Sequence, residues 1–145
     1  MRLTDERATP LELFNELHQE FNFEIDVCAL SSNAKLPKYF APGKDDGLKQ
    51  NWAPHRCFMN PPFSEILQWL EKTKIESEKG ALVVAILPND SFTRWFHKYI
   101  WDKSIRQFRI PVFFPDRRYS FGNHVNSSKF SILIAIFKQH QYPFE

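Results

Sequence analysis

The amino-acid sequence predicts a single α/β domain over residues 1–145, with helices on both faces of a sheet and an antiparallel strand at its end. Three observations predict this class. Short apolar segments alternate with segments in which apolar residues recur every three or four positions. The run 81–87 is apolar throughout, which is typical of a central strand covered on both faces. The last two strand-like segments, 105–114 and 129–138, are joined without a helical pattern, which indicates an antiparallel edge or hairpin.

The first half of the chain is expected to form a helix, a strand, a long loop, a second strand and a second helix. Pro10 suits the first turn of a helix. Apolar residues at helical spacing follow it: Leu11, Phe14, Leu17 and Phe21. Residues 23–29 have a strand pattern, and 30–54 has turn signals but weak periodicity, which favours a functional loop. A short strand at 56–59 and a helix at 62–74 complete this half.

In the second half, a charged loop at 76–80 is expected to precede the apolar strand. The segment Pro88-Asn89-Asp90-Ser91 ends that strand and begins a helix that runs to Trp101. A strand at 105–114, a polar loop and a strand at 129–138 follow.

Composition excludes several classes of protein. Of the 145 residues, 43% are hydrophobic and 16% are aromatic, so a core is available, and the net charge of +2 only permits a polyanionic partner. Cys28 and Cys57 lie in apolar runs and read as buried thiols of a reducing compartment. No run is long enough to cross a membrane, and residues 1–7 lack a signal-peptide pattern, so a cytoplasmic protein is expected. Three histidines show no metal-ligand spacing, so no metal is expected: His55, His97 and His124.

The tetrapeptide Asn60-Pro61-Pro62-Phe63 directly follows a buried strand and is the most informative motif. The Asn60 side-chain oxygen and the Pro61 carbonyl can accept hydrogen bonds from a planar NH2 group. Neither proline has an N–H that would compete for these acceptors, and the Phe63 ring offers a face for an extruded base. This pattern is typical of enzymes that methylate adenine N6, cytosine N4 or a glutamine amide. The structural alternative is an ordinary strand-to-helix turn.

Over nearly its whole length the chain resembles the small phage-type DNA N6-adenine methyltransferases of phages and prophages. The resemblance is carried by an ordered series of short motifs: Thr9-Pro10, Leu13-Phe14, Phe21-Asn22-Phe23, Asp26-Val27-Cys28-Ala29, Asn33-Ala34-Lys35, Tyr39-Phe40, Asp45-Asp46-Gly47-Leu48, Trp52, Asn60-Pro61-Pro62-Phe63, Leu87-Pro88 and Arg118-Tyr119-Ser120-Phe121. It implies a trimmed Rossmann-like methyltransferase fold, S-adenosylmethionine as the methyl donor, an adenine in duplex DNA as the acceptor, and a bacterial host cytoplasm as the location.

The resemblance also implies where the donor binds. Asp26, with Cys28 and Ala29, matches an acidic cofactor motif that faces the methionine ammonium group, and Thr9 and Pro10 are implied beside the same end. An acid in a surface turn and a threonine that caps a helix are the structural alternatives.

The donor adenine is implied to lie near a second acidic element. Asp46 would accept its N6 protons and Leu48 would pack on the ring, with Asp45 as the rival acid. A solvated Asp-Asp-Gly turn is the structural alternative.

For catalysis, the Asn60 side chain and the Pro61 carbonyl are expected to accept hydrogen bonds from the N6 protons of the target adenine. The N6 lone pair is then no longer delocalised into the ring and faces the donor methyl group. Pro62 fixes the turn, and Phe63 stacks the flipped base.

DNA contacts are expected from the loop between the last two strands and from the preceding helix. The candidates are Arg94, Arg117, Arg118, Tyr119 and Asn123. A solvated charged loop is the alternative.

Rival functions stay open at this point. The same site would serve an RNA adenine or a protein glutamine. Asp26 is followed by Leu30-Ser31-Ser32 instead of glycines, and Asn51 stands where relatives often have an acid, which favours a catalytically inactive nucleic-acid-binding relative. The expected assembly is a monomer or a homodimer.

Overall fold

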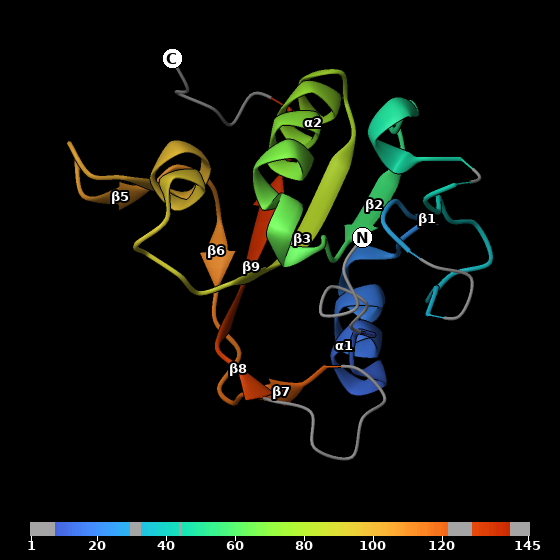
Figure 1. Ribbon diagram of the computed structural model, residues 1–145, viewed down its shortest axis with the longest axis horizontal. Helices are drawn as coiled ribbons and strands as arrows, with labels where there is room; N and C mark the ends of the chain where they lie inside the picture. The colour runs from blue at the N-terminus through green and yellow to red at the C-terminus, as the bar shows by residue number, and fades with distance from the viewer. Residues whose placement is uncertain (1–7, 30–32, 44, 122–128, 140–145) are drawn as a thin grey trace.

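The computed structural model describes residues 8–29, 33–43, 45–121 and 129–139. Its centre is a five-stranded sheet in the order β1-β2-β3-β9-β6 (Figure 1). These strands are β1 (Ile25–Asp26), β2 (Arg56–Met59), β3 (Leu82–Pro88), β9 (Ile132–Phe137) and β6 (Val112–Phe113). β1, β2 and β3 are parallel, whereas β9 pairs antiparallel with both β3 and β6. The predicted α/β class is therefore confirmed, whereas the antiparallel strand expected at the end of the sheet, β9, lies inside it and β6 forms the edge.

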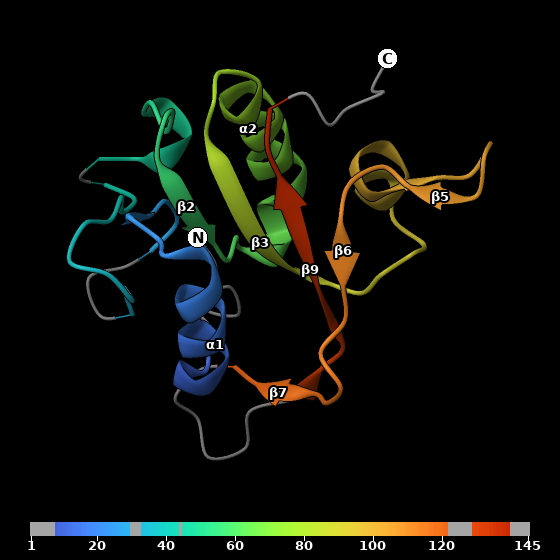
Figure 2. The same cartoon turned by 180° about the vertical axis from the view of Figure 1, so that it is seen from behind.

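Two helices cover opposite faces of the sheet, as predicted. The helix α1 (Leu11–Phe21) packs on the face that carries Phe58 and Val84. The helix α2 (Ile66–Glu78) packs on the face that carries Cys57 and Val83. Because side chains alternate between the faces of a strand, neighbouring residues of β2 and β3 belong to different cores. Figure 2 shows α1 in front of the sheet and α2 behind it.

The boundaries of α1 follow from local chemistry. Pro10 precedes the helix, and Leu13, Phe14 and Leu17 form its buried face. Asn22 ends it in the left-handed conformation, at φ 53°, and its N–H donates to the His18 carbonyl. An asparagine tolerates that conformation better than most residues, which explains why the helix stops here.

The second helix is longer than the sequence pattern indicates. A 3₁₀ turn, η3 (Phe63–Glu65), leads into α2, which continues to Glu78. The prediction of a charged loop from residue 76 was wrong, because the Glu76 carboxylate is buried and accepts hydrogen bonds from the backbone N–H groups of Trp52 (2.6 Å) and Ala53 (3.2 Å). A carboxylate that accepts hydrogen bonds in this way can be buried within a helix, although its charge alone predicts an exposed loop.

The loop between β1 and β2 is irregular, as predicted, apart from one 3₁₀ turn, η2 (Gly47–Lys49). Gly47 is required there, because a Cβ atom would lie 2.1 Å from the Val27 carbonyl oxygen. The Trp52 indole N–H donates to the Gly47 carbonyl at 2.8 Å. These contacts, together with Glu76, fix the end of the loop against β1 and α2.

The region after β3 differs from the prediction. The expected long helix is replaced by a turn at 90–93 and, after it, a short π-helix, η4 (Phe96–Ile100). The expected strand at 105–114 is divided between sheets: β4 (Trp101–Asp102) pairs with β5 (Gln107–Phe108) in a hairpin, and only β6 joins the central sheet. Pro111 separates β5 from β6, and a proline cannot donate to a ladder of strand hydrogen bonds.

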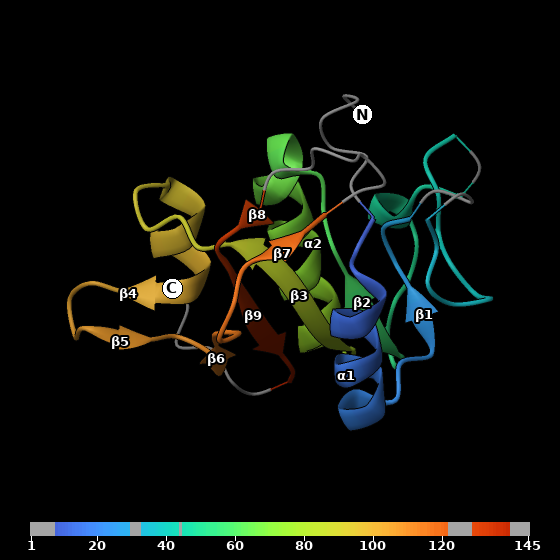
Figure 3. The same cartoon turned by 90° about the horizontal axis from the view of Figure 1, so that it is seen from below.

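A third small sheet pairs β7 (Tyr119–Ser120) with β8 (Lys129–Phe130). Figure 3 shows that the β4–β5 hairpin and the loop after β1 lie at opposite sides of the molecule. Among the described residues, no helix has the length and apolar character needed to span a membrane.

Candidate functional site

A cavity lies at the carboxyl ends of β1 and β2. It contains about 730 Å³ of space not occupied by atoms, part of it open to solvent. Its walls come from the residues before α1, the end of β1, the following loop, the end of β2 and the start of α2. The lining residues are Ala8, Thr9, Asp26, Cys28, Ala29, Asn33, Pro42, Asp46, Leu48, Phe58, Asn60, Pro62, Glu65 and Trp69. Parallel strands bring their carboxyl ends to the same edge, where open α/β sheets bind ligands.

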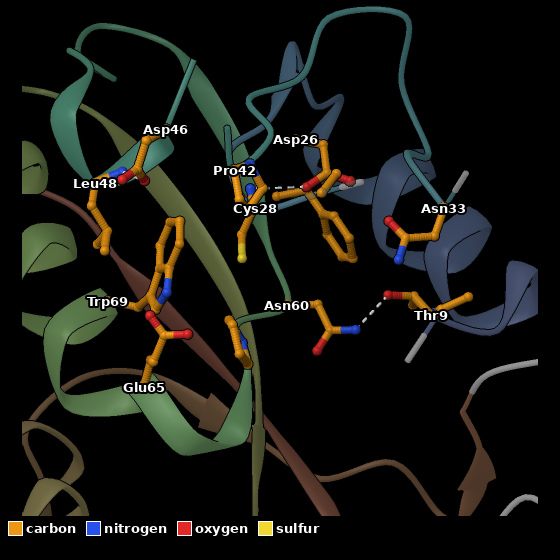
Figure 4. A pocket seen from close by; sticks show the side chains of 14 residues that line it. Thr9, Asp26, Cys28, Asn33, Pro42, Asp46, Leu48, Asn60, Glu65 and Trp69 are labelled. Atoms are coloured by element: carbon orange, nitrogen blue, oxygen red, sulfur yellow. Dashed lines mark hydrogen bonds between the residues drawn. The ribbon is translucent and has the colours of Figure 1, made fainter. Parts of the chain in front are cut away.

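Asn60 follows β2 directly, so the strand fixes its position at the cavity wall. Its Nδ2 donates a hydrogen bond to the Thr9 Oγ1 at 2.8 Å (Figure 4). Pro61 and Pro62 are buried immediately after it, and Pro62 begins the η3 turn. The amide is therefore held between two segments that are 51 residues apart in the sequence.

Asp26 ends β1 and is only 2% exposed. Its Oδ1 accepts from the Cys28 N–H at 3.2 Å and its Oδ2 from the Lys35 N–H at 3.4 Å. Burial raises the pKa of the Asp26 carboxyl from 3.8 to about 7, and the two N–H groups oppose that shift only in part. Asp26 thus carries a carboxyl group that changes charge near neutral pH at the wall of the cavity.

The structure separates the two acids of the Asp-Asp-Gly turn. Asp46 lines the cavity, and its Oδ1 accepts from the Leu48 N–H at 3.0 Å as the cap of η2. Asp45 does not line it, and its Oδ1 accepts from the Ala41 N–H at 3.0 Å. Of the two rivals, Asp46 faces the cavity.

Among the described residues, the charged ones that line the cavity are all acidic. Three carboxyl groups line it, from Asp26, Asp46 and Glu65, whereas none of the described lining residues is a lysine, arginine or histidine. The pKa of the Cys28 thiol is raised well above 9.0, mainly by burial and to a smaller extent by these three acids, so the thiol is neutral. The arrangement suits a ligand with positive charge. No group of residues suited to a metal ion occurs in the described part of the chain.

Comparison with known proteins adds a family to this geometry. Residues 2–143 match the family described as DNA N-6-adenine-methyltransferase (Dam). The chain belongs to the Dam family. It is also 31% identical over 120 residues to the "DNA N-6-adenine-methyltransferase" of Haemophilus phage HP1 (strain HP1c1). That match covers 81% of this chain and 66% of the phage protein, slightly less than two thirds of the relative's length.

Most of the donor-binding and catalytic residues predicted for this Dam-family chain meet at the cavity. Those that line it are Thr9, Asp26, Cys28, Ala29, Asp46, Leu48, Asn60 and Pro62. Four others do not: Pro10 lies at the start of α1, Asp45 faces Ala41, Pro61 is buried in the turn, and the partly buried Phe63 packs against the core.

The sequence reasoning missed other residues of the cavity: Ala8, Asn33, Pro42, Phe58, Glu65 and Trp69. Glu65 and Trp69 are four residues apart across η3 and α2, so both lie over the same side of the helix start. Figure 4 places them with Asp46 and Leu48, across the cavity from Thr9 and Asn33. The sequence signal for these two residues was their four-residue spacing directly after the Asn60 tetrapeptide. Residues that follow the site in a helical turn lie close to the site again one turn later.

The residues predicted to contact DNA have different surroundings. Arg117 forms an ion pair with Glu12 of α1 and lies over the ring of Tyr119, at 5.0 Å from its guanidinium carbon to the ring centre. The Tyr119 side chain is buried against α1. Arg94 and Arg118 are exposed, and Arg118 lines a shallow groove with Asn89 and Ser131. The remaining candidate, Asn123, lies outside the described residues.

Proposed function

We propose that this Dam-family chain transfers the methyl group of S-adenosylmethionine to N6 of an adenine in duplex DNA. The observation that carries the proposal is the position of Asn60, which opens into the same cavity as Asp26 at adjacent strand ends. Family membership and the name of the phage relative support the reaction class. The alternation of parallel strands with a covering helix, closed by an antiparallel strand, supports a trimmed Rossmann-like methyltransferase fold.

The cavity fits the proposed donor in charge. S-adenosylmethionine carries a sulfonium and an ammonium charge, which match a lining with three acids. We assign the ammonium end to Asp26, with Cys28 and Ala29, and the nucleoside end to Asp46 and Leu48.

When bound, S-adenosylmethionine supplies an electrophilic methyl carbon on a positively charged sulfur. The Asn60 side-chain oxygen and the Pro61 carbonyl accept hydrogen bonds from the N6 protons of the adenine, which localises the lone pair on nitrogen. With the donor held by Asp26 and Asp46, that lone pair would form the new N–CH3 bond, the electrons of the S–CH3 bond would stay on sulfur, and one N6 proton would leave for solvent. The contribution of the chain is therefore positioning and electrostatic stabilisation.

Phe63 is proposed to stack on the flipped base, although in this structure its partly buried ring packs against the core. DNA contacts are assigned to the exposed Arg94 and Arg118 and to Asn123. Arg117 and Tyr119 contact α1, Arg117 through the ion pair with Glu12 and Tyr119 through its buried ring. The assembly is proposed to be a monomer or a homodimer.

A labelling experiment tests the reaction. The protein is incubated with tritiated S-adenosylmethionine and unmethylated duplex DNA, beside Asn60→Ala and a control, Asn15→Ala, which changes an exposed asparagine on α1. We expect label in N6-methyladenine with the unchanged protein and the control, and none with Asn60→Ala. Label with Asn60→Ala would refute the role of Asn60. Donor binding without label in DNA would indicate an acceptor other than DNA adenine. Absence of donor binding would refute the proposed function. For the DNA contacts, Arg118→Ala is expected to weaken DNA binding, and unchanged binding would remove Arg118 from the interface.

A further inference from the structure

Thr9 and Asn60 form a hydrogen bond at the wall of the cavity. Thr9 is 4% exposed, and its Oγ1 accepts from the Asn60 Nδ2 at 2.8 Å. Figure 4 shows the two side chains pointing toward each other on one side of the cavity. The bond joins the segment before α1 to the end of β2.

An asparagine amide has two ends of similar shape and opposite hydrogen-bonding character. Its oxygen accepts, its nitrogen donates, and rotation about the last side-chain torsion exchanges them with little steric cost. Only the orientation that directs Oδ1 at the substrate can bind the N–H groups of an amine. The reverse orientation would place two donors face to face. A group that occupies the nitrogen end therefore determines how often the amide is competent.

We propose that Thr9 is a positioning residue for the reaction: its hydroxyl holds the Nδ2 end of Asn60, so that Oδ1 is directed at the exocyclic amine of the target base. This inference rests on the proposed function above. It changes the role of Thr9, which the family resemblance places beside the methionine end of the donor.

The position of the Thr9 hydroxyl is itself well fixed. Thr9 directly precedes Pro10, whose φ is −56° and which is the N-cap residue of α1. The helix is anchored by Phe14, whose ring meets that of Phe58 edge to face at 5.0 Å between ring centres. A β-branched side chain also has few rotamers. Because Phe58 lies two residues before Asn60, the packing of α1 on β2 brings hydroxyl and amide together.

The test compares two substitutions at Thr9. Thr9→Val keeps the shape and removes the hydroxyl, whereas Thr9→Ser keeps the hydroxyl. Thr73→Val is the matched control, because Thr73 is also a buried threonine, and its hydroxyl donates to the Trp69 carbonyl at 2.7 Å. For each protein, the single-turnover rate of methyl transfer and the calorimetric affinity for S-adenosylmethionine are measured.

We expect Thr9→Val to slow methyl transfer by about tenfold to hundredfold. Its affinity for S-adenosylmethionine should stay within about twofold, and Thr9→Ser and Thr73→Val should keep rates within about threefold. A Thr9→Val rate equal to that of the unchanged protein would overturn the inference. So would a loss of donor affinity as large as the loss of rate, because that result belongs to a residue that binds the donor.

A second readout does not depend on activity. The side-chain amide resonances of Asn60, identified by their absence in Asn60→Ala, should shift in Thr9→Val and keep their positions in Thr9→Ser. Unshifted resonances in Thr9→Val would overturn the inference. If the unchanged protein transferred no methyl group to DNA, the proposed function would fail, while this comparison would still decide whether Thr9 orients Asn60.

Discussion

The buried carboxyl group of Asp26 makes donor binding sensitive to pH. Its pKa is raised to about 7, mainly by burial, so the group is largely protonated in mildly acidic solution. If the carboxylate binds the donor ammonium, the affinity for S-adenosylmethionine follows the ionised fraction. That fraction is about 3% at pH 5.5 and about 50% at pH 7 for a pKa near 7. Affinity should therefore rise about 16-fold over this interval, or about 1.6 kcal/mol.

Isothermal titration calorimetry at pH 5.5, 6.2 and 7.0 measures this dependence while the donor amino group, with a pKa of about 7.7–8.0 for an α-amine, stays protonated. Asp26→Asn should remove the pH dependence, and Asp116→Asn, a change of an exposed acid, should keep it. A flat profile for the unchanged protein would refute the reasoning. An equally steep profile for Asp26→Asn would assign the titration to another group.

The same shift predicts an effect on folding. Because the pKa of Asp26 in the folded protein lies above its ordinary value of 3.8, the protonated group favours the folded state. That contribution is present below about pH 4 and is lost as pH rises to about 7, a loss of up to about 4 kcal/mol. Without donor, Asp26→Asn should therefore have a higher free energy of unfolding than the unchanged protein at pH 8, measured by urea denaturation. Equal stabilities at pH 8 would contradict this.

Three further predictions concern individual acidic residues. Asp46→Asn should weaken donor affinity about tenfold and Asp45→Asn less than about threefold by calorimetry, since only Asp46 faces the cavity; the reverse order would exchange their roles. Glu76→Ala should lower the free energy of unfolding by about 3–5 kcal/mol in urea, and the exposed Glu78→Ala by less than about 0.5 kcal/mol. Glu65→Gln should reduce the preference for S-adenosylmethionine over S-adenosylhomocysteine about two- to fivefold, because the product lacks the sulfonium charge; an unchanged ratio of the two affinities would refute this.

Periodicity and turn chemistry were enough to predict the elements that position the site. The strand at 56–59 has the predicted bounds, and α1 and the apolar strand β3 lie where their patterns predict them. The predicted apolar face of α1 is correct only in part, because Leu11 is 63% exposed and Leu13 is buried instead. These segments fold as their local pattern indicates, because each buries apolar side chains against the sheet.

The errors occur where contacts distant in sequence decide the structure. Residues 105–114 have one continuous strand-like pattern, yet a hairpin with β4 takes β5 out of the central sheet. Glu76 reads as a loop residue because its partners, the N–H groups of Trp52 and Ala53, are more than 20 residues away. Secondary-structure propensity is a property of one segment, whereas strand pairing and buried hydrogen bonds depend on partners elsewhere in the chain.

The cavity shows the same division between local and distant information. Asp26 and Asn60 were predicted from their positions at the ends of strand-like segments, from the Asn60 tetrapeptide and from the family resemblance. Glu65 and Trp69 were missed because their sequence patterns are those of an ordinary amphipathic helix start. They belong to the cavity only because β1 and β2 are parallel neighbours, with Asp26 in register with Phe58, so that the turn after β2 folds back over the end of β1. Sheet topology thus brings Glu65 to the cavity, where we propose that it favours a charged donor over its neutral product.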